Sequence, residues 1–479
     1  MNEQAQSPSA IPFFEKDDGE LNIVQVKLID FLHKHGFGKV YVESEMSSSL
    51  VRVEEGIVHR TSKERIRDFV METVRCVPDD GVPKGFSKKD FEDLLIRTSH
   101  IYFGSDFVTN LPRLDIEFNR DTREEAFFYF GNCAVRVRKD RIEQLSYDEL
   151  DGAVWADQII NRRFELLPDK EVLTGSHWFQ FLNNVMGGGT ARTNALWTAL
   201  GYLLHGYKDP VNAKAIVFLD EAISDVPDGR TGKSLVAEAL QKLVPVHRID
   251  ARNFRFGGQF SFQSIGIEHQ VVDFNDASED FAFEKLFSLI TDDMQVERKY
   301  QDEVTIPFDD APKILISTNH VIEGEGSSFE DRVFQIEFAP RYNASHRPVD
   351  DFEKRFFEEW GKREWRRFDN LMMLFVQMYL RDGLKSYKHE NLSKRRLRQE
   401  TSPEFAEWIL AEDPGEYNKK ELFEAFKADL GDDFVFAGTQ KQFTRWCHAY
   451  GRIYTRSKLP TRKSGGDRFI TIPELEDGS

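Results

Sequence analysis

The pattern of hydrophobic and polar positions predicts alternating strands and helices in the middle of the chain. Residues 215–219 (AIVFL) are uniformly apolar, as in a buried strand, and residues 232–244 (GKSLVAEALQKLV) have helical spacing. Two more strands are expected at residues 269–277 and 311–320, both ending in polar side chains, with a helix at 281–290 between them. This order is typical of an α/β fold.

The region before this core has a different pattern. Residues 21–37 and 61–74 have helical periodicity, whereas residues 47–60 and 126–147 alternate as hairpins do. We therefore expect a mixed α+β N-terminal domain over residues 1–152, to which the sequence assigns no role.

A pair of acids in this domain raises one chemical question. Asp115 and Glu117 in RLDIEF have the D-x-D spacing of the metal pair of an archaeo-eukaryotic primase. Neither a histidine nor a third acid follows at an interval that would complete a two-metal site. The pattern therefore favours two outward-facing acids on an alternating strand.

The last part of the chain predicts a small module of helices and a hairpin. Residues 418–430 have the pattern of an amphipathic helix, residues 439–451 that of a second helix, and residues 452–472 that of two strands around a glycine-rich turn. Helix, helix and hairpin in this order indicate a winged-helix-like DNA-binding domain over residues 403–479. A basic linker over residues 386–402 precedes it.

Length and composition limit the class of protein. At 479 residues with 40% hydrophobic side chains, the chain is too long for one core, so we expect about three domains. Residues 153–212, helical on both sides of a glycine break, are expected to form a collar or oligomerisation layer. No apolar run approaches the roughly 18–20 residues of a membrane span, the start is polar, and the three cysteines are scattered. These features predict a soluble protein of a reducing cytoplasm.

Charge is unevenly distributed along the chain. The formal net charge is −18, from 64 basic and 82 acidic residues, which by itself argues against a nucleic-acid partner. Basic side chains are nevertheless concentrated near the C-terminus, where we expect contact with DNA or RNA phosphates; the alternative is a solvated surface. The expected DNA contacts are Lys441, Arg445, Arg456, Lys458, Arg462 and Lys463.

A phosphate-binding loop is the main chemical signal. Residues 229–234 (GRTGKS) match the end of the pattern G-x-x-x-x-G-K-[ST], with Pro227 where the first glycine is expected. Glycines let the backbone approach phosphates, Lys233 would reach the β- and γ-phosphate oxygens, and Ser234 would place its hydroxyl on Mg²⁺. The residues expected to bind ATP are Asp228, Gly229, Arg230, Thr231, Gly232, Lys233 and Ser234.

The order of motifs after this loop resembles a known family. An acidic strand, a basic hairpin, a strand ending in asparagine and a trailing arginine follow within residues 271–338. From about residue 214 to 338 the sequence resembles the superfamily 3 helicases, ring-forming AAA+ ATPases of viruses, phages and plasmids. It is most similar to their phage and mobile-element primase-helicase branch. The resemblance implies an AAA+ P-loop NTPase core over residues 213–385.

The resemblance also assigns roles near the phosphate loop. Asp220 and Glu221 (in DEAISDVPDGRTGKS) are interpreted as a loop acid pair, because this branch carries an acidic stretch before its loop. Asn275 and Asp276 match the paired acids of the metal strand, with Asp276 organising Mg²⁺ and the attacking water. Asn275 departs from the family, in which an acid is common. Asp273, on the same face of the strand, is a candidate to compensate.

Three further positions match catalytic and pore residues of the family. Asn319 matches the polar sensor of the γ-phosphate. Arg332 matches the arginine finger that a neighbouring subunit's active site receives, and the alternative is a salt bridge with an adjacent acid. Arg298 and Lys299 lie on the hairpin that in this family projects into a central pore and tracks single-stranded DNA.

We therefore expect an ATP-dependent DNA helicase or translocase of a phage or mobile element, acting in replication with ATP and Mg²⁺. The resemblance implies a homohexameric ring in a bacterial cytoplasm, moving 3′→5′ on single-stranded DNA in its pore, without a membrane partner. Duplex or origin DNA would bind the C-terminal domain. The alternatives are a nucleotide-switched replication initiator or defence-related AAA+ protein that does not unwind DNA, and a combined primase-helicase.

Overall fold

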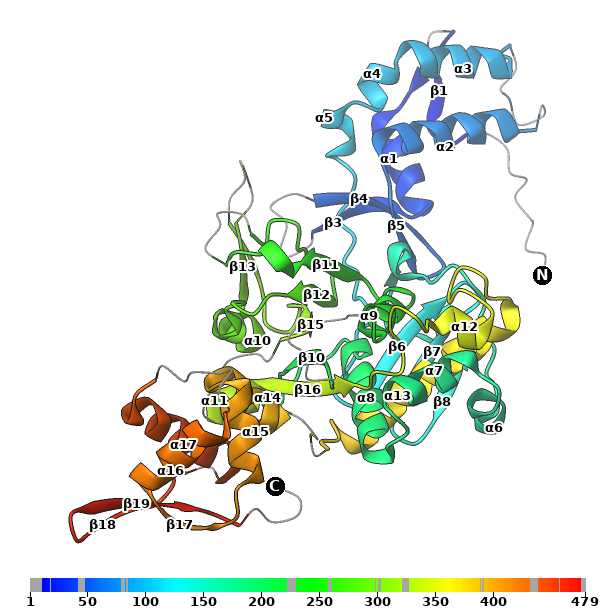
Figure 1. The fold of residues 1–479 in the computed structure, drawn as a ribbon. Helices are drawn as coiled ribbons and strands as arrows, with labels where there is room; N and C mark the ends of the chain where they lie inside the picture. The colour runs from blue at the N-terminus through cyan, green and yellow to red at the C-terminus, as the bar shows by residue number, and fades with distance from the viewer. Residues whose placement is uncertain are drawn as a thin grey trace. The chain divides into compact units, whose positions relative to one another are not determined.

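The computed structural model divides into two compact units (Figure 1). The N-terminal unit comprises Met1–Glu165 and Tyr300–Ile306, and the second unit comprises Leu166–Lys299 and Pro307–Ser479. The structure describes residues 11–17, 19–41, 48–78, 82, 85–221, 230–256, 261–297, 299, 303–320, 327–387, 389, 392–430, 438–455 and 457–474. Among the helices in these ranges, none combines the length and apolar character needed to cross a bilayer.

Small, mostly antiparallel sheets and short helices make up the N-terminal unit. Its strands are β1 (Phe14–Asp17), β2 (Glu20–Ile23), β3 (Phe37–Tyr41), β4 (Ser48–Glu54), β5 (Ile57–Arg60), β6 (Glu125–Phe130), β7 (Cys133–Arg138), β8 (Ile142–Leu145), β9 (Val154–Trp155) and β14 (Val304–Ile306). Its helices are α1 (Gln25–Lys34), α2 (Lys63–Cys76), α3 (Lys88–Arg97), α4 (Ser99–Tyr102) and α5 (Ser105–Val108). The strands β3, β4, β5 and β9 form one sheet, and β6, β7 and β8 form another.

Local sequence explains most of these elements. The helix predicted at residues 61–74 is α2, and the side chain of Ser62 caps it by accepting a backbone hydrogen bond. The hairpins predicted at residues 47–60 and 126–147 are confirmed as β4–β5 and β6–β7–β8. The helix predicted at residues 21–37 is shorter than expected, because its first residues pair with β1 as strand β2.

The acid pair of the N-terminal unit faces solvent. Asp115 and Glu117 are exposed, whereas the alternating Leu114, Ile116 and Phe118 pack against a small apolar core. Within the described residues, no group of three or more His, Cys, Asp or Glu side chains is arranged to hold a metal ion. The alternation confirms the interpretation of Asp115 and Glu117 as outward-facing acids.

A parallel sheet forms the centre of the second unit. Its strands are β10 (Ala215–Asp220), β11 (Val246–Asp250), β12 (Val271–Ala277), β15 (Lys313–Thr318) and β16 (Val333–Phe338), and this unit also contains β13 (Met294–Val296). Their order across the sheet is β11-β12-β15-β10-β16, and each neighbouring pair is parallel. β10 and β15 are buried along their whole length, as expected of central strands in a parallel sheet. The α/β class is confirmed.

Helices surround this sheet. They are α6 (Asp169–Leu173), α7 (His177–Val185), α8 (Thr190–Leu204), α9 (Lys233–Gln241), α10 (Phe287–Thr291), α11 (Ser327–Arg332), α12 (Pro348–Phe352) and α13 (Lys362–Asp382). α8 and α13 pack closely at Gly201. A Cβ there would lie 2.2 Å from the carbonyl oxygen of Phe375, so only glycine allows this approach. Trp197 of α8 stacks on the Phe375 ring, with centroids 5.3 Å apart. The helix predicted at residues 281–290 begins instead as a 3-10 turn that continues into α10.

The residues from 392 to 474 form what we call the C-terminal module. Its helices are α14 (Leu392–Glu400), α15 (Pro403–Ala411), α16 (Lys419–Asp429) and α17 (Gln440–Thr455), and its strands are β17 (Gly415–Asn418), β18 (Thr461–Ser464) and β19 (Asp467–Ile472). The strands form an antiparallel sheet in the order β17-β19-β18. Leu397, Phe405, Phe426, Phe443 and Ile470 share one core, so α14 belongs to this module.

The hairpin of the C-terminal module is confirmed, with a later start than predicted. Gly465 and Gly466 connect β18 to β19 with φ angles of +61° and +94°, which suit the two-residue turn of a tight hairpin. Residues 452–455 belong to α17 and not to a strand, because Ile453 and Tyr454 continue the apolar face of that helix into the core.

Candidate active site

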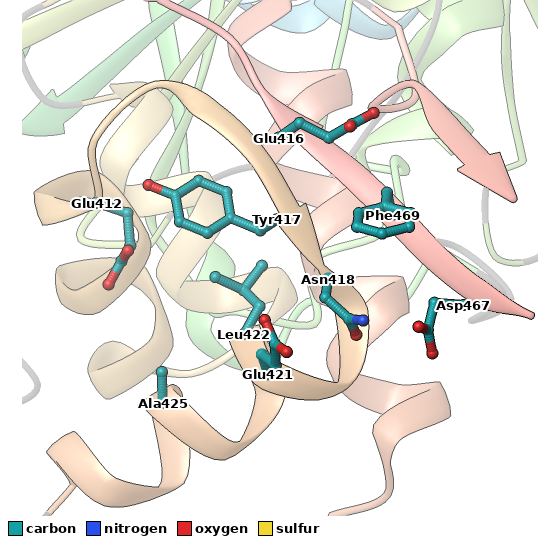
Figure 2. Close-up of a pocket in the computed structure, with 9 residues that line it drawn as sticks. All are labelled: Glu412, Glu416, Tyr417, Asn418, Glu421, Leu422, Ala425, Asp467 and Phe469. Atoms are coloured by element: carbon teal, nitrogen blue, oxygen red, sulfur yellow. The ribbon is translucent and has the colours of Figure 1, made fainter. Parts of the chain in front are cut away.

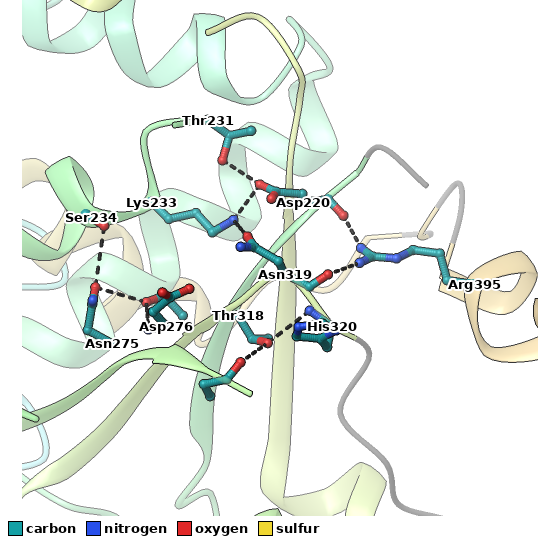
Figure 3. A network of polar contacts seen from close by, with 12 residues as sticks. Asp220, Thr231, Lys233, Ser234, Asn275, Asp276, Thr318, Asn319, His320 and Arg395 are labelled. Carbon is teal, nitrogen blue, oxygen red and sulfur yellow. Dashed lines mark hydrogen bonds and ion pairs between the residues drawn. The ribbon is translucent and has the colours of Figure 1, made fainter. Parts of the chain in front are cut away.

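The carboxyl ends of three neighbouring strands meet at one edge of the parallel sheet (Figure 3). β10 ends at Asp220, β12 at Ala277 and β15 at Thr318, and α9 begins nearby at Lys233. In open parallel sheets, ligands bind at this edge, and the first amide groups of a helix can hold a phosphate. The phosphate loop, the acidic strand and the strand-end asparagine of the sequence therefore converge here.

Gly232 shapes the start of α9. Its φ angle is +105°, a left-handed conformation that favours glycine, and it is the residue that caps the helix. A Cβ at this position would lie 2.9 Å from the ring of Phe181 and 3.0 Å from a methyl group of Val185. Glycine is therefore needed here both for its conformation and for close packing against α7.

Lys233 lies between two oxygen acceptors. Its ammonium is 2.6 Å from the Asp220 carboxylate and donates to the Asn319 side-chain oxygen, also at 2.6 Å (Figure 3). The Thr231 hydroxyl donates to the same Asp220 oxygen. Burial lowers the pKa of Lys233, and the nearby Asp220 carboxylate opposes that shift. The lysine is thus enclosed and paired with an acid.

The interpretation of Asp220 as a loop acid is wrong. Asp220 is the last residue of β10, it is buried, and its carboxylate contacts both Thr231 and Lys233. Its position directly after the apolar run AIVFL indicates the end of a buried strand. The carboxyl ends of parallel strands lie at one edge of the sheet, so this position could have placed Asp220 in the site. Glu221, the next residue, instead pairs with Arg192 at 2.6 Å.

A β-bulge lies near the end of β12. Between Phe274 and Ala277 the register against β15 shifts, and Asp276 within the shift has a φ angle of +60°. The Asn275 side-chain oxygen accepts hydrogen bonds from Ser234 at 3.4 Å and from Ser317 at 3.3 Å. Ser234 and the acidic strand are therefore adjacent.

The acids of β12 have different surroundings. Asp276 keeps 46% of its side-chain surface exposed, and its carboxylate lies 3.7 Å from Arg252. Asp273 is fully buried and pairs with Arg248 at 2.8 Å. Burial raises the pKa of Asp273, and Arg248 opposes the shift. Because Arg248 holds this carboxylate, we leave Asp273 out of the metal-binding set.

Arg332 lies at the amino end of the parallel strands, whereas Lys233 lies at their carboxyl end. Arg332 ends α11 immediately before β16, whose first residue, Val333, pairs with Ala215 at the start of β10. From there to Asp220, five steps of ~3.3 Å make roughly 17 Å of strand, which exceeds the length of an arginine side chain. The Arg332 guanidinium lies 5.2 Å from the ring centroid of Phe287. Arg332 therefore does not reach Lys233 of the same chain.

Several residues of the predicted site and of the predicted DNA contacts are exposed. Arg230, with a φ angle of +67°, and Lys299 are exposed. Lys441 and Arg445 are exposed on α17, Lys458 follows that helix, and Lys463 is exposed on β18. The predicted residues that fall outside the described ranges are Asp228, Gly229, Arg298 and Arg456.

One hollow in the C-terminal module is acidic (Figure 2). It measures about 470 Å³ and is lined by Glu412, Glu416, Tyr417, Asn418, Glu421, Leu422, Ala425, Asp467 and Phe469. Arg462, a predicted DNA contact, pairs with Glu416 at 2.6 Å. Four carboxylates repel a phosphate chain, so this hollow does not suit a nucleic acid.

Comparison with known proteins gives limited likenesses. Residues 226–332 match a family of unknown function, DUF5906. A search among curated proteins finds no match. Among solved structures, the apo C-terminal region of NrS-1 is 14% identical, with a TM-score of 0.40 over 93% of this chain and 98% of that one. A JCV helicase with a bound small molecule is 16% identical, with a TM-score of 0.24 over 51% of this chain and 75% of the other.

Replacing Asp220 with asparagine is expected to strengthen binding of ATP, the ligand that the phosphate-loop motif predicts. Asparagine keeps an oxygen for Thr231 but removes the charge that holds Lys233 and that would repel the phosphates. A hydrogen bond to a charged group contributes roughly 1.5–3 kcal/mol. Because the Asp220 carboxylate competes with the phosphates for Lys233, its removal should tighten ATP binding about tenfold or more. Titration with a fluorescent ATP analogue would measure it.

Glu221→Gln is the matched control for this substitution. It removes the neighbouring charge, which pairs with Arg192 and not with Lys233, so the affinity for ATP should stay near that of the wild type. Weaker ATP binding by Asp220→Asn would show instead that the acid holds the loop in its binding conformation.

Proposed function

We propose that the protein is an ATP-dependent DNA helicase or translocase that works as a ring in the replication of a phage or mobile element. The observation that carries the proposal is the convergence on Lys233: a buried lysine at the N-terminus of α9, contacted by the ends of β10 and β15. A buried cation at the N-terminus of a helix suits the phosphates of a nucleotide.

The side chains around Lys233 supply the other groups that ATP hydrolysis needs. We propose that Lys233 moves from Asp220 to the β- and γ-phosphates, and that Asn319 senses the γ-phosphate. Asp276, half exposed at the bulge, would accept a hydrogen bond from the attacking water. The glycine at position 232 lets the loop backbone approach the phosphates.

The oxygen donors near Ser234 fit a magnesium ion. The Ser234 hydroxyl, the Asn275 side-chain oxygen and the Asp276 carboxylate come from neighbouring elements, and Mg²⁺ needs few protein ligands when phosphates and waters complete its shell. Bound there, Mg²⁺ would neutralise charge on the β- and γ-phosphates. Asn275 supplies a neutral oxygen where an acid would hold the ion more strongly.

The position of Arg332 supports a ring. Arg332 precedes β16 at the amino end of the parallel strands, and Lys233 lies at their carboxyl end, an arrangement that suits an active site shared between subunits. We propose that Arg332 enters the neighbour's site and stabilises charge on the transferred phosphoryl group. Head-to-tail contacts of this kind close into rings, here a homohexamer of AAA+ type.

Two basic regions would contact DNA. In the C-terminal module, the order α15-β17-α16-α17-β18-β19 and the exposed Lys441 and Arg445 support a winged-helix-like domain that binds duplex or origin DNA through α17. Lys299, exposed between β13 and β14, would face single-stranded DNA in the pore together with Arg298. An acidic chain can hold DNA in this way, because binding depends on where positive charge is concentrated.

The test is the rate of ATP hydrolysis with Mg²⁺, measured with and without single-stranded DNA. We expect hydrolysis that single-stranded DNA stimulates several-fold, together with displacement of a labelled strand from a forked duplex. Hydrolysis or binding of ATP without stimulation or displacement would favour the nucleotide-switched initiator. No binding of ATP at all would contradict the proposed site.

A further inference from the structure

Arg395 of α14 reaches into the candidate nucleotide site. Its guanidinium donates to the backbone carbonyl of Asp220 and, at 2.7 Å, to that of Asn319 (Figure 3). The residue is 8% exposed, although it belongs to the basic run SKRRLR that the sequence places in a linker. Burying a guanidinium costs free energy unless its hydrogen bonds are satisfied. The two backbone carbonyls supply these hydrogen bonds at the candidate site.

The two carbonyls belong to the two residues that hold Lys233. Asp220 ends β10, Asn319 follows β15, and the side chain of each lies 2.6 Å from the lysine ammonium. A guanidinium is a rigid planar fork of donors, so it fixes two acceptors relative to each other in a way that a single ammonium does not. Arg395 therefore sets the geometry of the two strand ends on either side of Lys233.

The helix that carries this arginine is held by the C-terminal module. Leu397, two residues later, is fully buried in the module's core with Phe405 and Phe443. Lys394, one residue earlier, pairs with Glu407 of α15 at 2.9 Å. The position of the guanidinium in the nucleotide site thus depends on the packing of the C-terminal module.

We propose that Arg395 is a positioning residue through which the C-terminal module completes the ATP site, an inference that rests on the proposed ATPase function. It makes no contact with substrate in this scheme. It holds Asp220 and Asn319 where Lys233 and the γ-phosphate require them. The module that would bind duplex DNA is then also a structural part of the hydrolysis site.

The test compares four full-length proteins: the wild type, Arg395→Met, Arg395→Lys and Arg398→Met. Methionine keeps an unbranched apolar stem but has no donors. Lysine keeps the charge without the planar fork. Arg398 is the matched control, an arginine on the same helix whose guanidinium lies 4.0 Å from the Glu407 carboxylate of α15. For each protein, kcat and KM for ATP, binding of a fluorescent ATP analogue and the thermal unfolding midpoint are measured.

A displacement of catalytic groups by about 1 Å can lower the rate about 100-fold. We therefore expect kcat of Arg395→Met to fall about 100-fold. Its KM and its affinity for the ATP analogue should change little. Arg395→Lys should be intermediate, and Arg398→Met should match the wild type. A kcat for Arg395→Met equal to that of Arg398→Met would overturn the proposal.

Two further outcomes distinguish a failure of the positioning role of Arg395 from a failure of the proposed ATPase function. If Arg395→Met does not fold, Arg395→Lys decides: a reduced kcat at an unchanged unfolding midpoint supports the positioning role, and a wild-type kcat overturns it. If the wild type and Arg398→Met both fail to hydrolyse ATP, the proposed function itself fails, and not only the role of Arg395.

Discussion

Replacing Lys233 with alanine is expected to abolish ATP hydrolysis and to weaken nucleotide binding. Lys233 is the cation at the N-terminus of α9, and both of its side-chain partners, Asp220 and Asn319, are oxygen acceptors. Without the ammonium, the Asp220 carboxylate would face the phosphates directly. Loss of a charged group that stabilises a transferring phosphoryl group lowers rates by about 10³-fold or more. Steady-state hydrolysis and analogue binding would measure both effects.

The control for this substitution lies at the other end of the same helix. Lys242 follows α9 and pairs with Glu238 at 2.9 Å, so Lys242→Ala removes a lysine without touching the sheet edge. We expect it to hydrolyse ATP as the wild type does. Near-normal turnover in Lys233→Ala would exclude this edge of the sheet as the site of hydrolysis.

Replacing Arg332 with alanine is expected to leave ATP binding unchanged and to stop hydrolysis. Arg332 lies roughly 17 Å of strand away from Asp220 of the same chain, so in the proposed ring it would act at the site of a neighbouring subunit. Arginine fingers contribute about 10³–10⁵ in rate, so the loss would be plain in a standard hydrolysis assay.

Mixing two inactive variants makes the test specific for a shared site. Lys233→Ala and Arg332→Ala subunits can form an interface with an intact loop from one subunit and an intact arginine from the other. Some hydrolysis should return when the two exchange freely. Full activity of Arg332→Ala alone, or mixtures that stay inactive, would remove the support for subunits that share active sites.

The sequence predicted the parts of the site that follow from local pattern. The apolar runs gave β10, β12 and β15, and the glycine-lysine-serine motif gave the start of α9. Parallel strands end at a common edge, so the strand-end positions of Asn275 and Asn319, together with the start of α9 at Lys233, indicate one shared location.

The remaining contacts depend on tertiary packing. β11 (VHRID) was missed because polar and charged residues interrupt its apolar positions, as is usual for an edge strand. Arg395 lies 175 residues from Asp220 and sits in a basic run whose composition resembles a solvated linker. Asp273 lies on the face of β12 that strand alternation predicts, but its carboxylate pairs with Arg248 of the neighbouring strand β11. None of these partners is indicated by local sequence.

In the proposed ATP site, the pairing of Lys233 with Asp220 would make nucleotide binding an exchange of anions. A buried ammonium without a counter-ion would cost several kcal/mol, and a subunit that had just lost its nucleotide would bear that cost. Here the carboxylate at the end of β10 is already 2.6 Å away. The chain thus carries its own replacement for a departing phosphate. In the proposed ring, subunits that release product one after another would remain folded while empty.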